Sequence, residues 1–318
     1  MSRIPSAMFS VRSTSSGAAH ERRGEYRVPE STEALGTDFT GMSRADTIAR
    51  FDAILAQKMH GIAFSPFVDG QSPGSVVSEA QIRSRLEIIA PYTKWIRCFS
   101  CIDGSQAIPR IAREFGLKTM VGVELGPDAA ANEVELANGI AIAQAGHADI
   151  LAVGNEILLR KDLSEDALLG YIARAKAAVP DVPVSYVDAY FLFENHPRVA
   201  DACDVLLVNC YPFWEGCPAE YAMVYMQEVY GRSVRVANGK RVIVSETGWP
   251  TVGSTFGEAE PSHDNALQYF IRTFDWAATA GVELFYFASF DEAWKVGREG
   301  DVGAHWGVWD KDGVLKFR

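Results

Sequence analysis

The amino-acid sequence predicts an α/β protein, specifically a single-domain (β/α)8 (TIM) barrel. Eight short apolar runs recur along the 318 residues, and stretches of helical periodicity separate most of them, which predicts parallel strands joined by helices. A doubly wound sheet usually has fewer strands and a Gly-rich phosphate turn. Because eight runs are present and no G-x-G-x-x-G motif follows any of them, the sequence favours the closed barrel.

The chain is expected to begin with an N-terminal tail or extended arm over residues 1–42, followed by the barrel over residues 43–318. The tail is rich in Ser, Gly, Arg and Glu without periodicity, which is typical of a mobile segment. Ser43 and Asp46 resemble the cap of a helix, and apolar residues follow at helical spacing. This first helix is expected to lead into the first strand.

Each predicted strand is an apolar run bounded by polar or turn-forming residues. Strands that are buried on both faces have such continuous runs, as an all-parallel sheet requires. The eight runs lie at residues 61–65, 95–99, 119–123, 150–153, 182–186, 205–209, 242–245 and 283–288. Helices between them are predicted at residues 80–89, 107–115, 132–145, 165–178 and 265–280.

Composition restricts the class of ligand. A net charge of −11 without a basic stripe argues against nucleic acid or an anionic membrane as a partner, so a neutral ligand is expected. No stretch reaches the ~18 to 20 uninterrupted apolar residues of a membrane span, and the N-terminus lacks the apolar segment of a signal peptide. We expect a soluble monomer that is cytoplasmic by default, or periplasmic or secreted if a signal or membrane segment has been removed.

The cysteines and histidines predict neither a metal site nor a cofactor site. Five cysteines form an odd set, which argues against a complete disulfide framework. Cys98 and Cys101 form a C-x-x-C pair, but no second pair at zinc spacing and no nearby histidine accompany it. We expect buried free thiols, with a bridge between Cys210 and Cys217 as the alternative.

Two glutamates stand where predicted strands end. Glu156 follows the fourth run and Glu246 follows the seventh. The carboxyl ends of barrel strands form the rim that carries active sites, so the two side chains are expected to converge in space. Paired carboxylates that flank a cleft are the usual equipment for cleaving a glycosidic bond. The alternative is structural, since a strand-end glutamate can pair with an arginine or cap a helix.

Aromatic and polar residues are concentrated after the predicted strands. Examples are Phe67, Tyr211, Trp214 and Trp294. Polar loops are ordinary, but aromatic side chains left in solvent are a liability unless they stack on something. Sugar rings offer flat C–H faces for such stacking, and their hydroxyls bind Asn, Asp, Glu and Arg. The mixture therefore favours a saccharide cleft over ordinary loop packing.

From about Gly61 to Gly313 the chain resembles glycoside hydrolase family 17, a family of retaining (β/α)8 barrels that act on β-glucan. The resemblance rests on Val153-Gly154-Asn155-Glu156, on Ser245-Glu246-Thr247-Gly248-Trp249-Pro250-Thr251, and on Phe287-x-x-Phe290-Asp291-Glu292-x-x-Lys295 followed by Trp306-Gly307-Val308. The opening run and the loop after it look more like those of bacterial members, some of which transfer glucan chains instead of hydrolysing them.

The resemblance implies a role for each matching residue. Glu156 would be the general acid/base and Glu246 the nucleophile, which together would form and break a covalent glucosyl-enzyme on a β-glucan oligosaccharide or polysaccharide. Tyr211 would lie beside the nucleophile. The residues expected to bind substrate, by resemblance or by their place on the rim, are Phe64, Arg97, Asn155, Tyr211, Trp249, Glu292, Trp294 and Lys295.

The fate of the product stays open at this point. An endo-β-1,3-glucanase would pass the intermediate to water, whereas a β-1,3-glucan transglycosylase, elongating or β-1,6-branching, would pass it to a sugar. A non-catalytic glucan-binding barrel is disfavoured because both carboxylates are present. A barrel enzyme for phosphorylated metabolites would carry a Gly-rich phosphate site after the last two strands, which the segment around Gly248 does not resemble.

Overall fold

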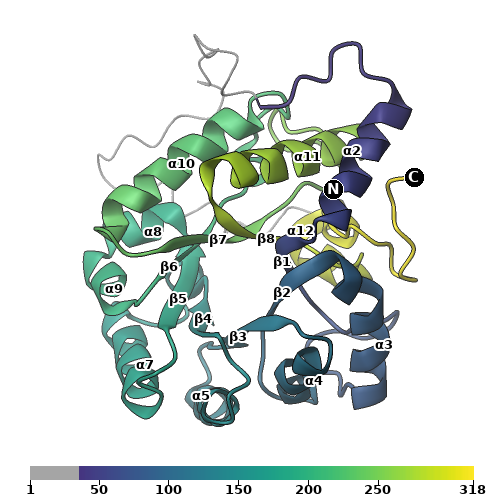
Figure 1. Ribbon diagram of the computed structural model, residues 1–318. Coiled ribbons are helices and arrows are strands. Elements are labelled where there is room, and N and C mark those ends of the chain that lie inside the picture. Colours follow the sequence, from purple (N-terminus) through teal and green to yellow (C-terminus); the bar gives the residue numbers. More distant parts are fainter. Residues whose placement is uncertain (1–35) are drawn as a thin grey trace.

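Eight parallel strands close into a barrel, with helices on the outside (Figure 1). The computed structural model describes residues 36–318. Strand order around the barrel follows the chain, and the last strand, β8 (Glu283–Tyr286), pairs with the first, β1 (Met59–Ala63). The predicted (β/α)8 barrel is therefore confirmed.

Each predicted apolar run overlaps one strand of the barrel. The strands between β1 and β8 are β2 (Thr93–Cys98), β3 (Lys118–Val123), β4 (Ile150–Asn155), β5 (Val184–Ala189), β6 (Leu206–Asn209) and β7 (Val242–Thr247). Neighbouring strands are hydrogen-bonded in parallel register all the way around. All eight C-terminal ends consequently lie at the same end of the barrel.

The five helices predicted between strands are present. They are α3 (Glu79–Ile89), α4 (Ile108–Glu114), α5 (Ala129–Gln144), α7 (Glu165–Ala178) and α11 (His263–Ala280). Four short helices were not predicted. They are α6 (Ile157–Arg160), α8 (Tyr190–Asn195), α9 (Pro197–Ala202) and α12 (Val296–Glu299). The prediction also lacked α10 (Ala222–Ala237), which covers β6 and β7 and buries Met223, Met226 and Val229.

The N-terminal helix α2 (Arg44–Ala56) completes the outer layer. Its predicted cap is confirmed, because the Ser43 hydroxyl accepts from the Asp46 N–H at 3.2 Å and the Asp46 carboxylate accepts from the Ser43 N–H at 3.3 Å. The helix lies beside α11 (Figure 1), where the rings of Phe51 and Phe270 are 4.9 Å apart. The helix also packs on the C-terminal segment, where the rings of Phe51 and Phe317 are 5.3 Å apart.

The structure describes only the last part of the expected tail, residues 1–42. Residues 1–35 lie outside the described residues. In the described part, Arg272 of α11 donates to the Thr37 carbonyl at 3.1 Å and stacks on Phe39 at 5.1 Å. Packing against the barrel therefore begins before Ser43.

A separate apolar cluster fills the inside of the barrel. It consists of Trp95, Met120, Ile150, Ala152, Val187, Val205, Leu207, Ile243 and Phe285. Gly61 makes room for this cluster, because a Cβ atom at that position would lie 2.5 Å from the Phe285 ring. The inward side chains form a packed core, so the barrel has no open channel beneath the C-terminal ends of its strands.

Register shifts occur near the C-terminal ends of three strands. They fall between Ala152 and Asn155 on β4, between Val208 and Asn209 on β6, and between Val244 and Thr247 on β7. Such irregularities re-aim side chains that a regular strand would point elsewhere. The residues they re-aim at the rim include Asn155, Asn209 and Glu246.

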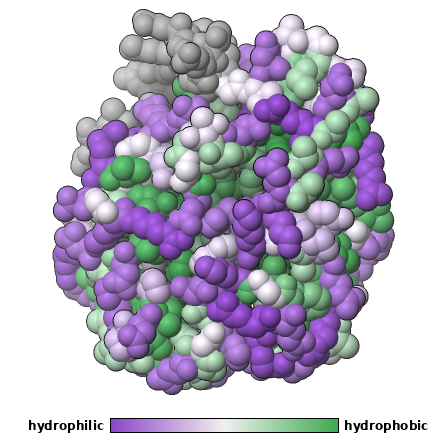
Figure 2. Space-filling view, in the orientation of Figure 1, coloured by the Kyte–Doolittle hydropathy of each residue, from purple (hydrophilic) through white to green (hydrophobic). Residues whose placement is uncertain are grey.

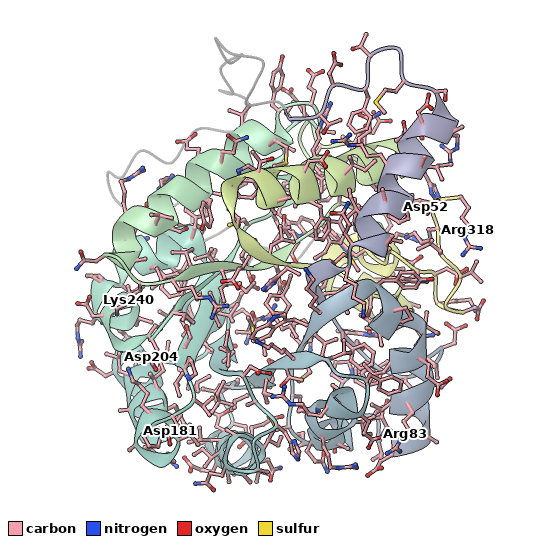
Figure 3. All side chains as sticks on the ribbon, viewed as in Figure 1. Asp52, Arg83, Asp181, Asp204, Lys240 and Arg318 are labelled. Carbon is pink, nitrogen blue, oxygen red and sulfur yellow. The ribbon has the colours of Figure 1, made fainter. Side chains whose placement is uncertain are left out.

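The face in Figures 2 and 3 carries mostly hydrophilic side chains, with hydrophobic ones in scattered areas. Asp181, Asp204 and Lys240, labelled in Figure 3, precede β5, β6 and β7 and mark the end at which these strands begin. Between residues 36 and 318, no helix is long and apolar enough to span a membrane. All five cysteines are buried and none of them forms a disulfide, so Cys210 and Cys217 are not bridged.

Glu283, at the start of β8, gives a testable pH dependence of stability. Hydrogen bonds from His60 and Arg241 lower the pKa of Glu283 to about 2. A lowered pKa stabilises the fold above the ordinary value of 4.5, and this contribution is lost as the pH falls toward 2. We expect Glu283→Gln to reduce the free energy of unfolding at pH 7 by about 1 kcal/mol, since the group is partly exposed.

Urea denaturation at pH 7 and pH 3 measures this difference. The gap between wild type and Glu283→Gln is expected to shrink at pH 3. The exposed Glu87, changed to Gln, is the control and should show no gap at either pH. An unchanged gap for Glu283→Gln across this range would show that its charge does not stabilise the barrel.

Candidate active site

The two predicted glutamates lie at the C-terminal ends of β4 and β7, where they share one hydrogen-bond network. Glu246 belongs to β7 and is 6% exposed, and Glu156 follows β4 and is partly buried. Four polar residues from β2, β4, β6 and β7 connect the two carboxyl groups. The barrel therefore brings together residues that are far apart in the sequence.

The backbone at the end of β4 forms a tight turn that places Glu156 at the rim of the barrel. Glu156 has φ 53°, a left-handed conformation that costs a non-glycine residue about 1–2 kcal/mol. Gly154, two residues earlier, has φ 90°, and a Cβ there would lie 2.9 Å from Ile157 and 3.3 Å from Tyr186. The Glu156 N–H donates to the Val187 carbonyl on β5 at 2.8 Å, which fixes the turn against the sheet.

Both carboxylate oxygens of Glu246 receive hydrogen bonds. The Arg97 guanidinium forms an ion pair with Oε1, and the Tyr211 hydroxyl donates to Oε2 at 2.6 Å. Arg97 is 2% exposed, and it also donates to the Asn155 side-chain oxygen at 2.9 Å. A cation and a hydroxyl donor therefore meet at this one carboxylate.

Asn209 connects Glu156 to the same network. Its Nδ2 donates to Glu156 Oε1 at 2.9 Å and approaches Asn155 Oδ1 at 3.4 Å. The Ser245 hydroxyl donates to Asn209 Oδ1 at 2.8 Å, which determines the direction in which the amide points. Asn209 therefore presents a donor, not an acceptor, to Glu156.

The two carboxyl groups have different electrostatic environments. Burial raises the pKa of Glu156, and the negative charge of Glu246 raises it further, while Asn209, Arg160 and Arg97 oppose the shift. Arg97 meanwhile compensates the charge of Glu246 directly. The arrangement can hold one protonated and one ionised carboxyl side by side, which is what acid-assisted nucleophilic displacement requires.

The predicted residues after β8 form one wall of the site. Lys295 pairs with Glu292 at 2.6 Å and lies 4.0 Å from the centre of the Phe287 ring. The Trp294 indole N–H donates to Glu292 at 3.0 Å, and the Trp294 ring meets Phe67 edge-on at 6.3 Å. Trp294 is partly exposed and can offer a ring face, whereas Glu292 and Lys295 are buried.

Three of the predicted substrate-binding residues, Phe64, Trp249 and Arg97, are buried in this structure. Phe64 and Trp249 are each 1% exposed, so neither ring can contact a sugar in this structure. Trp249 packs against Phe213 and Tyr269, and its indole N–H donates to the Glu260 carbonyl at 2.9 Å. Arg97 is equally buried and touches Glu246 instead of the open cleft. Strand-end position alone does not reveal whether a side chain points to solvent or under the next loop.

Two further polar residues at the site had no predicted role. Asn209 is the last residue of the predicted run 205–209, and the donor that it supplies depends on Ser245 of another strand. Glu299 ends the short helix α12, and one of its carboxylate oxygens is buried without a hydrogen-bond partner in the described chain. Burial raises the pKa of Glu299 to about 7, with Lys295 opposing and Glu246 adding to the shift. No sequence motif marks Glu299.

An open pocket of about 480 Å³ lies on the Glu156 side of the site. Its wall is largely aromatic. The lining residues are Glu156, Leu159, Ala189, Tyr190, Phe191, Asn209, Tyr211, Trp214, Glu215 and Tyr225. Trp214, one of the aromatic residues expected to stack on a sugar, is 8% exposed, so it offers only a small part of its ring to the pocket.

This fold and this pair of glutamates define the class of protein. A (β/α)8 barrel with carboxylates on two strand ends has the equipment of an enzyme that acts on glycosidic bonds. The model of the BtgE/BtgC glycoside hydrolase domain matches residues 61–307, which is well over half of the chain. The chain belongs to glycoside hydrolase family 17.

Related proteins extend over most of the chain. A glucan 1,3-beta-glucosidase of Schizosaccharomyces pombe is 29% identical over 73% of this chain and 78% of that protein. The glucan 1,3-beta-glucosidase of Saccharomyces cerevisiae is 26% identical over 87% of this chain and 96% of that protein. These relatives are fungal, so the expected likeness to bacterial members finds no support in them.

Solved structures give the same result. A family 17 beta-1,3-glucanosyltransferase from Rhizomucor miehei superposes with a TM-score of 0.72 at 27% identity, over 82% of this chain and 96% of that one. An active-site mutant of this enzyme in complex with laminaritriose superposes with a TM-score of 0.73 at 26% identity, with the same coverage. An endo-laminarinase from Formosa shares the fold, with a TM-score of 0.71 at 19% identity.

Proposed function

We propose that the protein is a retaining enzyme acting on β-1,3-glucan, with Glu156 as general acid/base and Glu246 as nucleophile. The observation that carries this proposal is the contrast between the two carboxyl groups. Burial and the nearby charge favour a proton on Glu156, while Glu246 forms an ion pair with Arg97 and accepts a hydrogen bond from Tyr211. Similarity to glucan 1,3-beta-glucosidases and to a beta-1,3-glucanosyltransferase supports the substrate.

In the first step, Glu246 attacks the anomeric carbon of the bound glucan. The bond between that carbon and the glycosidic oxygen breaks, and Glu156 gives its proton to this oxygen, so the leaving chain departs as an alcohol. The products are a glucosyl ester on Glu246 and an ionised Glu156. The Asn209 donor stabilises the negative charge that Glu156 has then acquired.

In the second step, Glu156 acts as a base. It takes a proton from water or from a sugar hydroxyl, whose oxygen attacks the anomeric carbon and displaces the Glu246 carboxylate. Both carboxyl groups return to their starting states. Each step inverts the anomeric centre once, so the β configuration is retained.

The other predicted residues would bind the sugar or orient these two groups. The Asn155 amide lies between the carboxyls, where it can meet the hydroxyl next to the anomeric carbon. Trp294 would support the sugar ring from the β8 side, and the buried Glu292, which accepts from the Trp294 indole N–H and pairs with Lys295, would hold that side chain in place. One chain supplies every residue of the site that is described, and we therefore expect a monomer to be active.

Transfer to a sugar acceptor is the second candidate, and the pocket beside Glu156 favours it. The leaving chain and the acceptor both occupy the side of the acid/base, because Glu156 exchanges a proton with each of them. The aromatic wall of this pocket can hold a sugar there and exclude water, which raises the share of transfer over hydrolysis.

The test uses a linear β-1,3-glucan oligosaccharide labelled at its reducing end, with the products followed by mass. Shorter products alone would identify a hydrolase, and labelled products of several lengths from the earliest time points would identify it as an endo-β-1,3-glucanase. Products longer than the substrate would identify a β-1,3-glucanosyltransferase, and digestion with a linkage-specific glucanase would separate elongation from β-1,6 branching. An untouched β-1,3-glucan, with turnover of another β-glucan, would overturn the proposed substrate.

A further inference from the structure

Asp188 is a buried carboxylate that the mechanism above does not use. It lies near the end of β5, beside the strand that carries Glu156, and it is fully buried. It accepts hydrogen bonds from the Tyr186 hydroxyl, from the Ala189 N–H at 2.8 Å and from the Leu159 N–H at 3.4 Å. Three neutral donors surround the group, and none of the lysines and arginines among residues 36–318 forms an ion pair with it.

Tyr186 and Asp188 together hold the turn on which Glu156 sits. The Leu158 N–H donates to the Tyr186 hydroxyl at 2.9 Å, and Leu158 and Leu159 form the first turn of α6, directly after Glu156. N–H groups in a first helical turn have no partner within the helix. The two side chains on β5 satisfy these groups and fix the left-handed turn against the neighbouring strand.

Asp188 and Glu156 also affect each other's charge. Burial raises the pKa of Asp188 to about 7, and the charge of Glu156 adds to the shift, while Tyr186 and backbone N–H groups oppose it. Two buried carboxyl groups that interact in this way do not both ionise readily, and the pair loses its protons in coupled steps.

Other charged and polar groups act on Glu156 from every side. They are Glu246 of β7, Arg97 of β2, Asn209 of β6, Arg160 of α6, Tyr211 after β6 and Glu299 of α12. Most of them line the rim or contact substrate in the proposed mechanism. Asp188 is fully buried, so it can be changed without removing a group that faces the cleft.

We infer that Asp188 and Tyr186 are positioning residues for the acid/base. Together they anchor the turn that carries Glu156, and the Asp188 carboxylate provides a negative charge that helps to keep the proton on Glu156 until the leaving oxygen takes it. This inference rests on the proposed role of Glu156.

The test is the pH profile of kcat/KM for Asp188→Asn on a β-1,3-glucan oligosaccharide. The alkaline limb reports the loss of the proton from Glu156 in the free enzyme. Without the negative charge at position 188, this limb is expected to move down by about one pH unit. Below pH 5, where Asp188 is protonated in the wild type as well, the two enzymes should converge.

A second variant covers the case in which Asp188→Asn does not fold. Tyr186→Phe keeps the carboxyl group but removes its hydroxyl donor, so Asp188 holds its own proton more tightly and the alkaline limb is expected to move the same way. Asp204→Asn is the matched control. Asp204 accepts from the Val184 N–H at 2.9 Å at the opposite end of β5 (Figure 3), and its loss should not move the limb.

The pH profiles of the three variants distinguish the positioning role from a purely structural one. A limb that moves down in Asp188→Asn and Tyr186→Phe but not in Asp204→Asn supports the inference. A uniform loss of rate at every pH, with the limb in place, would reduce Asp188 to a purely structural role and overturn it. Full activity of Glu156→Gln would instead overturn the proposed function, so the two failures can be distinguished.

Discussion

Glu246→Gln is expected to lower kcat on β-1,3-glucan on the order of 10⁴-fold or more, because an amide cannot form the glucosyl ester. The fold should survive, since Gln has the same shape and its oxygen can still accept from Tyr211 or Arg97. Initial rates on the labelled oligosaccharide measure the loss, and the far-ultraviolet circular dichroism spectrum checks the fold.

Glu258→Gln is the matched control for this prediction. Glu258 is exposed in the loop after β7, and its backbone N–H, not its side chain, contacts Gly216. The control should retain wild-type activity. If Glu246→Gln retained more than a few per cent of activity while remaining folded, Glu246 would not be the nucleophile.

Glu156→Gln is expected to lower kcat on unactivated β-1,3-glucan by roughly 10³-fold, which lies within the usual contribution of general acid–base catalysis. The loss in the first step should be far smaller with a dinitrophenyl β-glucoside, because dinitrophenolate leaves without a proton. Release of dinitrophenol in a rapid burst, followed by slow turnover, would report an intact first step and an impaired second one.

Azide provides a further check on Glu156. A small anion needs no base to attack the intermediate, so azide should restore turnover of the dinitrophenyl substrate in Glu156→Gln and yield a β-glucosyl azide. It should not restore turnover in Glu246→Gln by the same route. An α-glucosyl azide from Glu156→Gln, or equal losses on both substrates without any rescue, would contradict the assigned roles.

Much of this barrel could be predicted because its strands are continuous apolar runs. Each run is buried on both faces, so its continuous hydrophobicity indicates both where the strand lies and that the segment is a strand. Glu156 and Glu246 were predictable for the same reason, since each is a charged residue at the end of such a run. The helix α10 was not predicted, although its buried face consists of apolar and aromatic residues apart from Ser233.

The remainder of the site depends on contacts between strands. Trp249 and Trp294 both follow a strand of the barrel, yet the first is buried against Phe213 and Tyr269 and the second is partly exposed. The donor that Asn209 presents to Glu156 depends on Ser245, which lies on the neighbouring strand. Asn209 also lies at a register shift between β6 and β7, and no local sequence pattern predicts such a shift.

The most direct test of the central claim is to trap the intermediate. A 2-deoxy-2-fluoro-β-laminaribiosyl fluoride slows both chemical steps through its fluorine at C2, while its reactive leaving group lets the first step proceed. Peptide mass spectrometry of the inactivated protein is expected to place the added sugar on Glu246. An adduct on another residue, or unimpeded turnover to a product of inverted configuration, would contradict a double displacement at this pair of glutamates.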